Sequence, residues 1–201
     1  LLELADRAYR IGFPMMSDDE YDEILGDDEP TLSDYMDDDL EMAHVVPMLS
    51  QKKTYSASEV VKDPKFTRSV ATLKLDGFAV SLHYHNGVLL RAMTRGDGSR
   101  GHIITNHVLA GVVNVPYILP FNSDMCEGDV IVRGEMVIDK KFSDRMHTAR
   151  SICVGAFGRK DYVKVVALEP HFFAYDMIGS GCVLYSEVLK KLESAFDVVP
   201  Y

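Results

Sequence analysis

The most constraining feature of the sequence is an Asn-Gly pair at residues 86–87 with an alternating apolar pattern beside it. Before the pair, Val80, Leu82 and Tyr84 occupy every second position, which is the period of a β-strand with one buried face. After it, residues 88–93 return as an apolar partner strand. Because Asn-Gly tolerates the positive φ angles of a type I′ turn, this segment predicts an antiparallel β-hairpin.

The rest of the chain mixes further strands with helices. Two capping boxes, Ser17-Asp18-Asp19-Glu20 and Ser56-Ala57-Ser58-Glu59, each predict the start of a helix. We expect two short helices within residues 1–25, helices at 56–63, 102–113, 140–147 and 187–196, and strands at 72–76, 129–138 and 171–177. This pattern predicts an α+β fold with antiparallel β-sheets flanked by helices, not a doubly wound parallel sheet.

The acidic balance of the chain argues against strong binding of nucleic acid by this sequence alone. The 201 residues carry a formal net charge of −10, and much of the acidity falls within residues 18–41. Duplex DNA binding normally relies on a basic face. No apolar run reaches the length of a membrane span, and no secretory leader is visible. Three widely spaced cysteines indicate reduced thiols and a cytoplasmic location.

Lys74-Leu75-Asp76-Gly77 is the segment with the clearest chemical meaning. A lysine can attack phosphorus and carry a nucleotide as a phosphoramidate. A protonated amine cannot attack, so a nucleophilic lysine needs burial or neighbouring cations. Lys74 and Asp76 alternate with Leu75 and are expected on one strand face. Asp76 also suits an Asx turn before Gly77, so the tetrapeptide alone is weakly diagnostic.

Four other motifs surround this tetrapeptide. Upstream stands His44-Val45-Val46-Pro47-Met48-Leu49-Ser50, and downstream follow Thr94-Arg95-Gly96-Asp97-Gly98, Val132-Arg133-Gly134-Glu135 and Phe172-Phe173-Ala174-Tyr175. In this order and spacing they resemble the adenylation domain of NAD-dependent DNA ligases, from Tyr9 to about Tyr201. The resemblance implies the DNA ligase/nucleotidyltransferase fold, which is ATP-grasp-like. Residues 1–43 would form a helical subdomain that binds nicotinamide mononucleotide (NMN) plus an acidic connector, and residues 44–201 the adenylation domain.

The resemblance also implies a reaction. Lys74 would attack the α-phosphate of NAD, NMN would leave, and AMP would pass from the lysine to the 5′-phosphate of a DNA nick. Such transfers depend on positioning and charge stabilisation, with Mg²⁺ as the expected ion. The catalytic residues implied are Lys74, Asp76, Arg95 and Glu135, with Asp76 and Glu135 as metal ligands. The cofactor-binding residues implied are Tyr9, Asp18, Tyr21, Asp22, Ser50, Leu73, Arg95, Arg133, Glu135, Arg150 and Tyr175.

Several of these residues also have purely structural interpretations. Arg133 and Glu135, two positions apart, would suit a cross-strand ion pair. Tyr175 would suit a core strand, and Phe172 and Phe173 are expected in the core. In the N-terminal segment, a tyrosine packed inward and an aspartate capping a helix would serve the fold rather than the nicotinamide.

The sequence departs from the family pattern in places. Thr72 stands where the family has a glutamate that reads adenine, and a second family arginine falls at Gly158, one place before Arg159. The later family motifs are not present, so we expect a fragment or one subunit of a split ligase, binding nicked duplex DNA weakly and needing a second polypeptide or further domains. A catalytically impaired NAD-binding or regulatory subunit, or an ATP-dependent nucleotidyltransferase, are the alternatives.

One motif points to different chemistry. Residues 96–101 match the Gly-x-Gly-x-x-Gly pattern of dinucleotide-binding βαβ units. The preceding strand, however, is the second arm of the predicted hairpin. No strand ending in an acidic residue follows about 20 residues later, as that motif requires. The pattern therefore does not predict a hydride-transfer site.

Overall fold

The computed structural model describes residues 41–50, 53, 56, 58, 69–120, 128–144, 146–158 and 162–201. The predicted helices within residues 1–25 lie outside these ranges, as does most of the helix expected at 56–63. The elements run in the order β1 (Glu41–Ala43), β2 (Phe78–His85), β3 (Val88–Thr94), β4 (Arg100–His102), α5 (Thr105–Gly111), β5 (Asp129–Val137), the 3₁₀-helix η3 (Lys140–Phe142), α6 (Ala149–Phe157), α7 (Tyr162–Ala167), β6 (His171–Ile178) and α8 (Tyr185–Leu192).

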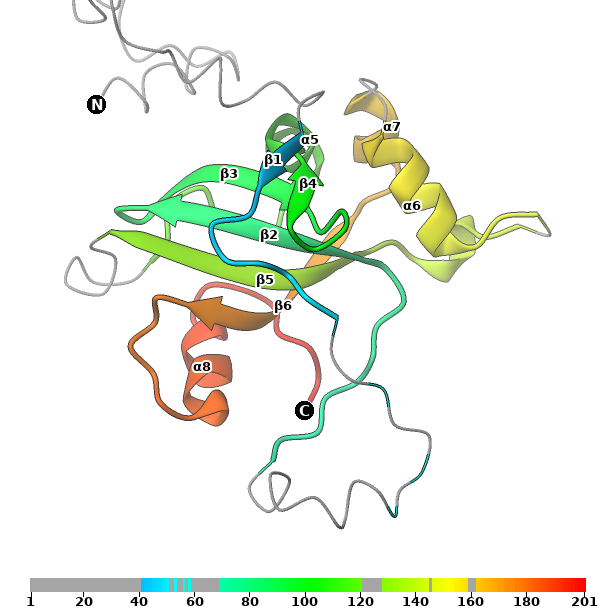
Figure 1. The fold of residues 1–201 in the computed structure, drawn as a ribbon. Helices are drawn as coiled ribbons and strands as arrows, with labels where there is room; N and C mark the ends of the chain where they lie inside the picture. The colour runs from blue at the N-terminus through cyan, green and yellow to red at the C-terminus, as the bar shows by residue number, and fades with distance from the viewer. Residues whose placement is uncertain are drawn as a thin grey trace, which may run out of the picture.

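The centre of the fold is a four-stranded sheet in the order β3-β2-β5-β6, with every neighbouring pair antiparallel (Figure 1). The predicted hairpin is confirmed, since Asn86 and Gly87 join β2 to β3 with φ angles of 48° and 80°. The predicted strands at 129–138 and 171–177 are confirmed as β5 and β6. A second sheet pairs β1 with β4. The described part is thus α+β with antiparallel sheets, as predicted.

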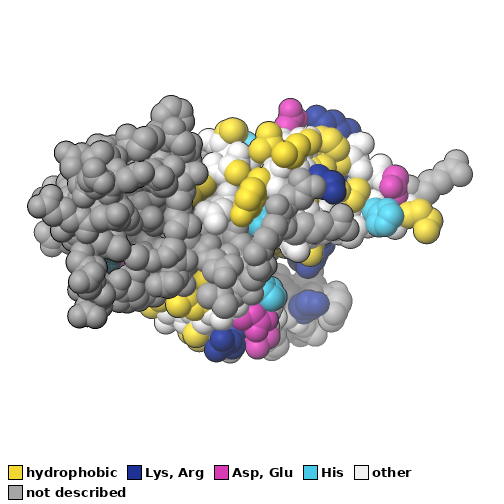
Figure 2. Space-filling model, turned by 90° about the horizontal axis from the view of Figure 1, so that it is seen from above, with side chains coloured by type: hydrophobic (Ala, Val, Ile, Leu, Met, Phe, Trp, Pro, Cys, Tyr) yellow, Lys and Arg dark blue, Asp and Glu magenta, His cyan; other side chains and the backbone are white. Residues whose placement is uncertain are grey.

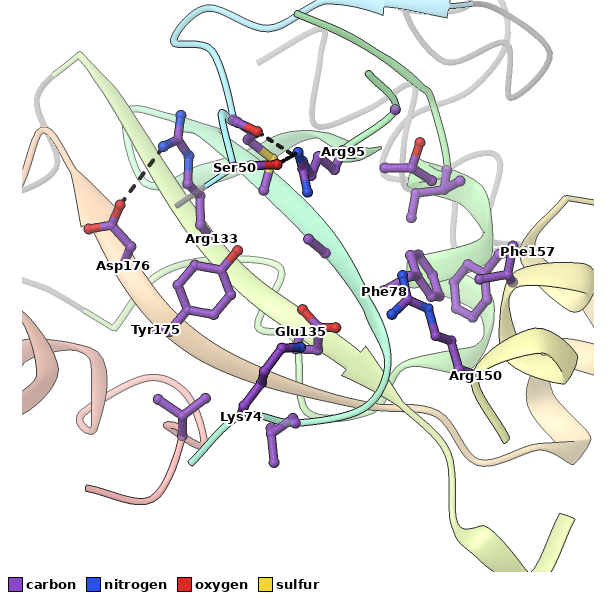
Figure 3. A pocket seen from close by; sticks show the side chains of 18 of the residues that line it. Ser50, Lys74, Phe78, Arg95, Arg133, Glu135, Arg150, Phe157, Tyr175 and Asp176 are labelled. Atoms are coloured by element: carbon purple, nitrogen blue, oxygen red, sulfur yellow. Dashed lines mark hydrogen bonds and ion pairs between the residues drawn. The ribbon is translucent and has the colours of Figure 1, made fainter. Parts of the chain in front are cut away.

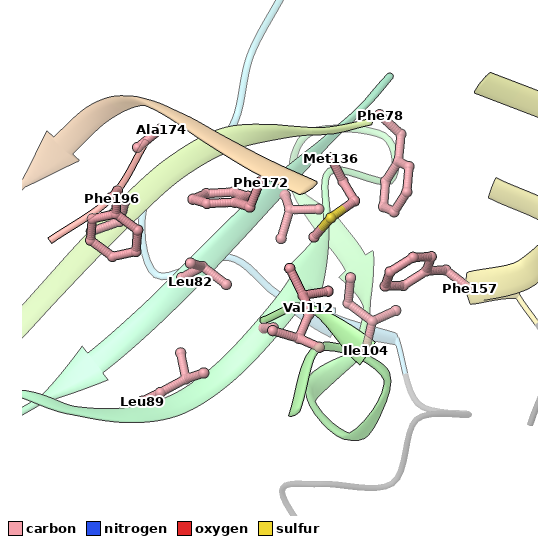
Figure 4. Close-up of a cluster of buried hydrophobic side chains, with 14 of the residues drawn as sticks. Phe78, Leu82, Leu89, Ile104, Val112, Met136, Phe157, Phe172, Ala174 and Phe196 are labelled. Atoms are coloured by element: carbon pink, nitrogen blue, oxygen red, sulfur yellow. The ribbon is translucent and has the colours of Figure 1, made fainter. Parts of the chain in front are cut away.

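One face of the four-stranded sheet carries the hydrophobic core. Val80, Leu82 and Tyr84 of β2 are fully buried, as are Val132 and Met136 of β5. Side chains from α5, α6 and α8 and from the segment after α8 complete this cluster (Figure 4). Because successive side chains of a strand alternate between faces, the residues between these core positions point to the opposite face, where the candidate site lies.

Two predicted boundaries in the first half of the chain are wrong. Residues 72–76 belong to no strand, because β2 begins only at Phe78. The helix expected at 102–113 begins at Thr105, because the preceding residues pair as β4 with β1. The Thr105 hydroxyl accepts a hydrogen bond from the Ala92 N–H at 3.0 Å, which fixes the start of α5 against β3.

The second half shows a further difference. The helix expected at 140–147 is wrong, since only η3 forms there. Asp144 accepts hydrogen bonds from the backbone N–H groups two and three residues later, a turn that competes with helix formation. The sequence analysis missed α6, which begins after Thr148, whose hydroxyl caps it by accepting the Ser151 N–H. The helix expected at 187–196 is present as α8, two residues earlier and shorter.

The glycine-rich segment at residues 96–101 consists of the turn after β3 and the first two residues of β4, and it does not open a βαβ unit. Gly96 and Gly98 adopt positive φ angles of 56° and 99°. The Asp97 carboxylate accepts the backbone N–H groups of Ser99 and Arg100 at 2.7 and 2.8 Å. In the described part of the chain, no helix is long and apolar enough to cross a membrane.

Candidate nucleotide site

Residues 44–50, here called the strap, cross the face of the sheet that points away from the core (Figure 1). The strap is tied to the turn after β3, because the His44 N–H donates to the Ser99 carbonyl at 2.9 Å and the Met48 N–H to the Gly98 carbonyl at 2.7 Å. Met48 is only 3% exposed. The strap thereby forms one wall of a site above the sheet.

Next to the strap lies an open pocket of about 1400 Å³ (Figure 3). Segments far apart in the sequence supply its walls: the strap, the segment before β2, strands β2, β3, β5 and β6, helix α6 and the C-terminal residues. The predicted site residues that line it are Ser50, Leu73, Lys74, Arg95, Arg133, Glu135, Arg150 and Tyr175.

Among the predicted site residues that the structure describes, Asp76 does not line this pocket. Asp76 is exposed beside it, close enough for its charge to act on Glu135. Tyr9, Asp18, Tyr21 and Asp22 lie outside the described residues, so their proposed contacts with NMN stay a prediction. Arg159, one place after Gly158, also lies outside the described residues, so its match to the second family arginine stays a prediction.

Lys74 lies on the segment that leads into β2. Its neighbour Leu73 donates its backbone N–H to the Pro200 carbonyl at 2.9 Å, so the C-terminal segment holds this part of the chain in place. The Lys74 side chain extends beside Glu135 in Figure 3. Lys74 is exposed, so the burial that a nucleophilic lysine would favour is not provided by the protein alone.

Glu135 is the carboxylate at the centre of the site. It is half-buried on β5, and burial raises its pKa above the usual value. A hydrogen bond from the Gly77 N–H at 3.2 Å and the positive charges of Lys74 and Arg150 oppose this rise, whereas the charge of Asp76 adds to it. The carboxylate is therefore sensitive to any cation or proton placed near the lysine.

Close packing against β5 explains why the Lys-x-Asp-Gly motif ends in a glycine, Gly77. A Cβ atom at this position would lie 2.0 Å from the backbone carbonyl oxygen of Met136 and 2.8 Å from a methyl carbon of Val137. Only glycine lets the chain approach β5 this closely. The close approach brings the Gly77 N–H to Glu135 and sets the distance between the Lys74 segment and β5.

Arg95, directly after β3, joins the strap to the pocket. Its Nε donates to the Met48 carbonyl at 3.0 Å and its Nη2 donates to the Ser50 hydroxyl at 2.5 Å (Figure 3). The imidazole of His44 lies 3.1 Å, through Nε2, from the Arg95 carbonyl. The structure thus connects the His44–Ser50 motif directly to the Thr94–Gly98 motif.

Arg133 and Tyr175 lie side by side on neighbouring strands at one end of the pocket (Figure 3). The Arg133 Nη1 atom lies 3.9 Å from a carboxylate oxygen of Asp176. Burial, with a further contribution from the negative charge of Glu135, raises the pKa of Tyr175 to about 12. Its phenol is therefore neutral at physiological pH and presents an aromatic face and a polar tip to the pocket.

The opposite side of the pocket is apolar, and sequence analysis did not identify it. Phe78 and Phe157 pack edge-to-face with ring centroids 5.2 Å apart, beside Arg150 at the start of α6 (Figure 3). Phe78 could have been recognised as the first residue of the alternating strand, but Phe157 belongs to the helix that was missed. Of the two aromatics expected in the core, Phe172 is fully buried and Phe173 is half-buried.

A metal site built wholly from protein side chains is not found in the described part of the chain, where no three His, Cys, Asp or Glu residues lie together to hold an ion. Asp76 and Glu135 are the two carboxylates beside Lys74. Mg²⁺ commonly binds one or two carboxylates together with substrate phosphates and water. These two residues fit that mode of binding, not a closed metal cage.

The antiparallel α+β fold and a pocket containing a lysine, a carboxylate and arginines are consistent with a nucleotidyltransferase domain. A family model described as NAD-dependent DNA ligase adenylation domain matches residues 38–152, which is more than half of the chain. The chain therefore belongs to the family of NAD-dependent DNA ligase adenylation domains.

Curated relatives agree with this assignment. The chain is 32% identical over 196 residues to a DNA ligase of Borreliella afzelii (strain PKo), covering 86% of this chain and 28% of the relative. It is 32% identical to DNA ligases of Fervidobacterium nodosum (171 residues, 72% of this chain, 24% of the relative) and Chlorobium chlorochromatii (160 residues, 69% and 23%). The chain thus spans about a quarter of the length of these relatives.

Proposed function

We propose that this chain is the adenylation unit of an NAD-dependent DNA ligase. The Lys74 amine attacks the α-phosphate of NAD, a nitrogen–phosphorus bond forms, the bond to the bridging pyrophosphate oxygen breaks, and NMN leaves. AMP then passes from Lys74 to the 5′-phosphate of a DNA nick. The observation that carries this proposal is the position of Lys74 beside Glu135 in a pocket that also holds Arg95, Arg133 and Arg150.

Besides the covalent bond to Lys74, a transfer of this kind requires positive charge around the phosphate. Arg150 stands near Glu135 on the α6 side of the pocket, and Arg95 stands on the strap side. We assign both to the nucleotide phosphates or ribose. Tyr175 supplies an aromatic face for the adenine, and the buried pair of Phe78 and Phe157 backs the opposite wall.

Lys74 has to lose a proton before it attacks. Because Lys74 is exposed, we assign part of its desolvation to the dinucleotide, which would cover the open pocket. The amine lies beside the carboxylate of Glu135, whose raised pKa suits a group that exchanges a proton near the reacting nitrogen.

Asp76 and Glu135 are the residues that would hold Mg²⁺. A bound Mg²⁺ neutralises charge on the transferring phosphate. The local chemistry supports this assignment, because burial makes the Glu135 carboxylate costly to ionise and a cation offsets that cost. The hydrogen bond from the Gly77 N–H holds the Glu135 carboxylate in place.

DNA is the proposed acceptor of AMP, and we expect this chain to bind it weakly. A net charge of −10 provides little attraction for a polyanion, since affinity for DNA grows with the number of phosphates that cations neutralise. We propose that further DNA-binding surface, in the same polypeptide or in a second one, contributes most of the affinity for the nick.

The test is intact-mass analysis after incubation with Mg²⁺ and either NAD or ATP. We expect the mass to rise by one AMP with NAD and not with ATP, and Lys74→Ala to abolish the rise. Lys141→Ala is the matched control, because Lys141 is an exposed lysine that pairs with Glu169 outside the pocket. Labelling by ATP alone would indicate an ATP-dependent nucleotidyltransferase, and no adduct with either nucleotide would indicate a chain that binds without catalysis.

A further inference from the structure

Three consecutive backbone carbonyl groups of the strap accept hydrogen bonds from two arginines. Arg133 donates through Nη2 to the carbonyls of Val46 and Pro47, at 2.6 and 2.9 Å. Arg95 donates through Nε to the next carbonyl, that of Met48, at 3.0 Å. These contacts join positions 87, 86 and 47 residues apart, so they are tertiary contacts that local sequence does not determine.

The middle of the strap has little apolar anchoring of its own. Val45 is 61% exposed, Val46 36% and Leu49 72%, whereas Met48 is buried. The backbone bonds that tie the strap to the β3–β4 turn start from His44 and Met48, on either side of residues 45–47. Arg133 is therefore the group that holds the stretch between these two bonds.

The Nη2 group of Arg133 is committed to this role. An Nη2 atom carries two N–H groups, and both have a carbonyl partner in the strap. The Nε atom is buried without a hydrogen-bond partner among the described residues, and the side chain as a whole is only 13% exposed. The remaining nitrogen, Nη1, lies 3.9 Å from Asp176. Because the side chain is largely buried and its Nη2 group binds the strap, little of the guanidinium can reach a phosphate in the pocket.

We propose that Arg133 is a positioning residue that acts on the nucleotide through the strap. By fixing the carbonyls of Val46 and Pro47 above β5, it sets the wall that ends in Ser50. That wall in turn orients Arg95, whose Nη2 donates to the Ser50 hydroxyl. The effect on catalysis rests on the proposed adenylation activity, whereas the effect on the strap does not.

Amide hydrogen exchange, followed residue by residue by NMR in the full chain without nucleotide, tests the positioning role. In Arg133→Met we expect exchange of the His44 and Met48 amides to rise at least tenfold. The amides of β2 serve as the internal reference and are expected to keep their protection. Arg133→Lys, which retains a charged donor, is expected to recover part of the strap protection. Asp176→Asn, which affects only the Nη1 side, is the matched control and is expected to leave strap exchange near wild type.

The kinetic readout uses the rate of AMP transfer to the protein at varied NAD. We expect Arg133→Met to raise KM for NAD at least tenfold with a smaller change in kcat, and Arg133→Lys to fall between this variant and the wild type. Unchanged strap exchange in Arg133→Met together with lost NAD binding would overturn the proposal and assign Arg133 to the nucleotide directly. If Arg133→Met also loses protection of the β2 amides, the variant is destabilised as a whole, and the same exchange and kinetic measurements on Arg133→Lys then test the proposal. Failure of the wild type to accept AMP would contradict the proposed function and leave the strap result standing.

Discussion

Replacing Gly77 by alanine tests how closely the lysine segment must approach β5. The new Cβ atom would lie 2.0 Å from the Met136 carbonyl oxygen, and real contacts of this kind are at least 3.0 Å, so the two segments must separate by about 1 Å. The obstacle is backbone and cannot rotate away. Overpacking of this kind costs about 1–3 kcal/mol of unfolding free energy, and a misplacement of about 1 Å costs about 10²-fold in rate.

The assay compares Gly77→Ala with Gly155→Ala. Gly155 lies in α6, and a Cβ atom there would meet nothing within 4 Å, so alanine should stabilise the helix by about 0.5–1 kcal/mol without changing the site. Urea unfolding and the rate of AMP transfer from NAD would be measured for both. Wild-type stability and rate in Gly77→Ala would refute the argument that close approach to β5 positions Lys74.

Two further predictions concern titrating groups. Burial raises the pKa of Glu135, so the folded chain binds the carboxyl proton more tightly and loses stability as the pH rises from 4.5 through the raised folded value. Glu135→Gln should therefore have a higher melting temperature than wild type at pH 8 and the same melting temperature below pH 4.5, and it should transfer AMP at least tenfold more slowly. Equal melting temperatures at both pH values would contradict this argument. Hydrogen bonds with His85 and His83 lower the pKa of Asp129, so its stabilising effect is present above 3.8 and is lost as the pH falls through the folded value. Asp129→Asn should be less stable than wild type at pH 7, with a difference that shrinks in acid unfolding experiments; a constant difference down to pH 2 would argue against the ion pairs.

Local patterns predicted the parts of the fold that depend on local chemistry. The hairpin of β2 and β3 was predictable because the Asn86-Gly87 turn and the alternating strand residues both favour a hairpin. The helix expected at 140–147 was wrong because Asp144 satisfies nearby backbone N–H groups in a turn, and the capping residue Thr148 starts the real helix a few residues later.

The candidate site was predictable as a set of motifs but not as a geometry. Arg133 and Glu135 were expected on one face of one strand, and both line the pocket. The Nη2 group of Arg133 donates to strap carbonyls 86 and 87 residues away. This contact depends on tertiary packing and has no local signal in the sequence. The exposure of Lys74 was likewise unexpected, because its segment precedes β2 and does not form part of the sheet.

The most direct test of the central claim is to locate AMP on the chain after incubation with NAD and Mg²⁺. Trypsin does not cleave after a modified lysine, and residues 69–91 contain Lys74 as their only internal lysine or arginine. The account predicts an uncleaved peptide spanning residues 69–91 with the mass of one added AMP, provided that digestion avoids the acid that breaks phosphoramidates. An AMP found on another residue such as Lys53, or a peptide cleaved after Lys74 in fully labelled protein, would contradict it.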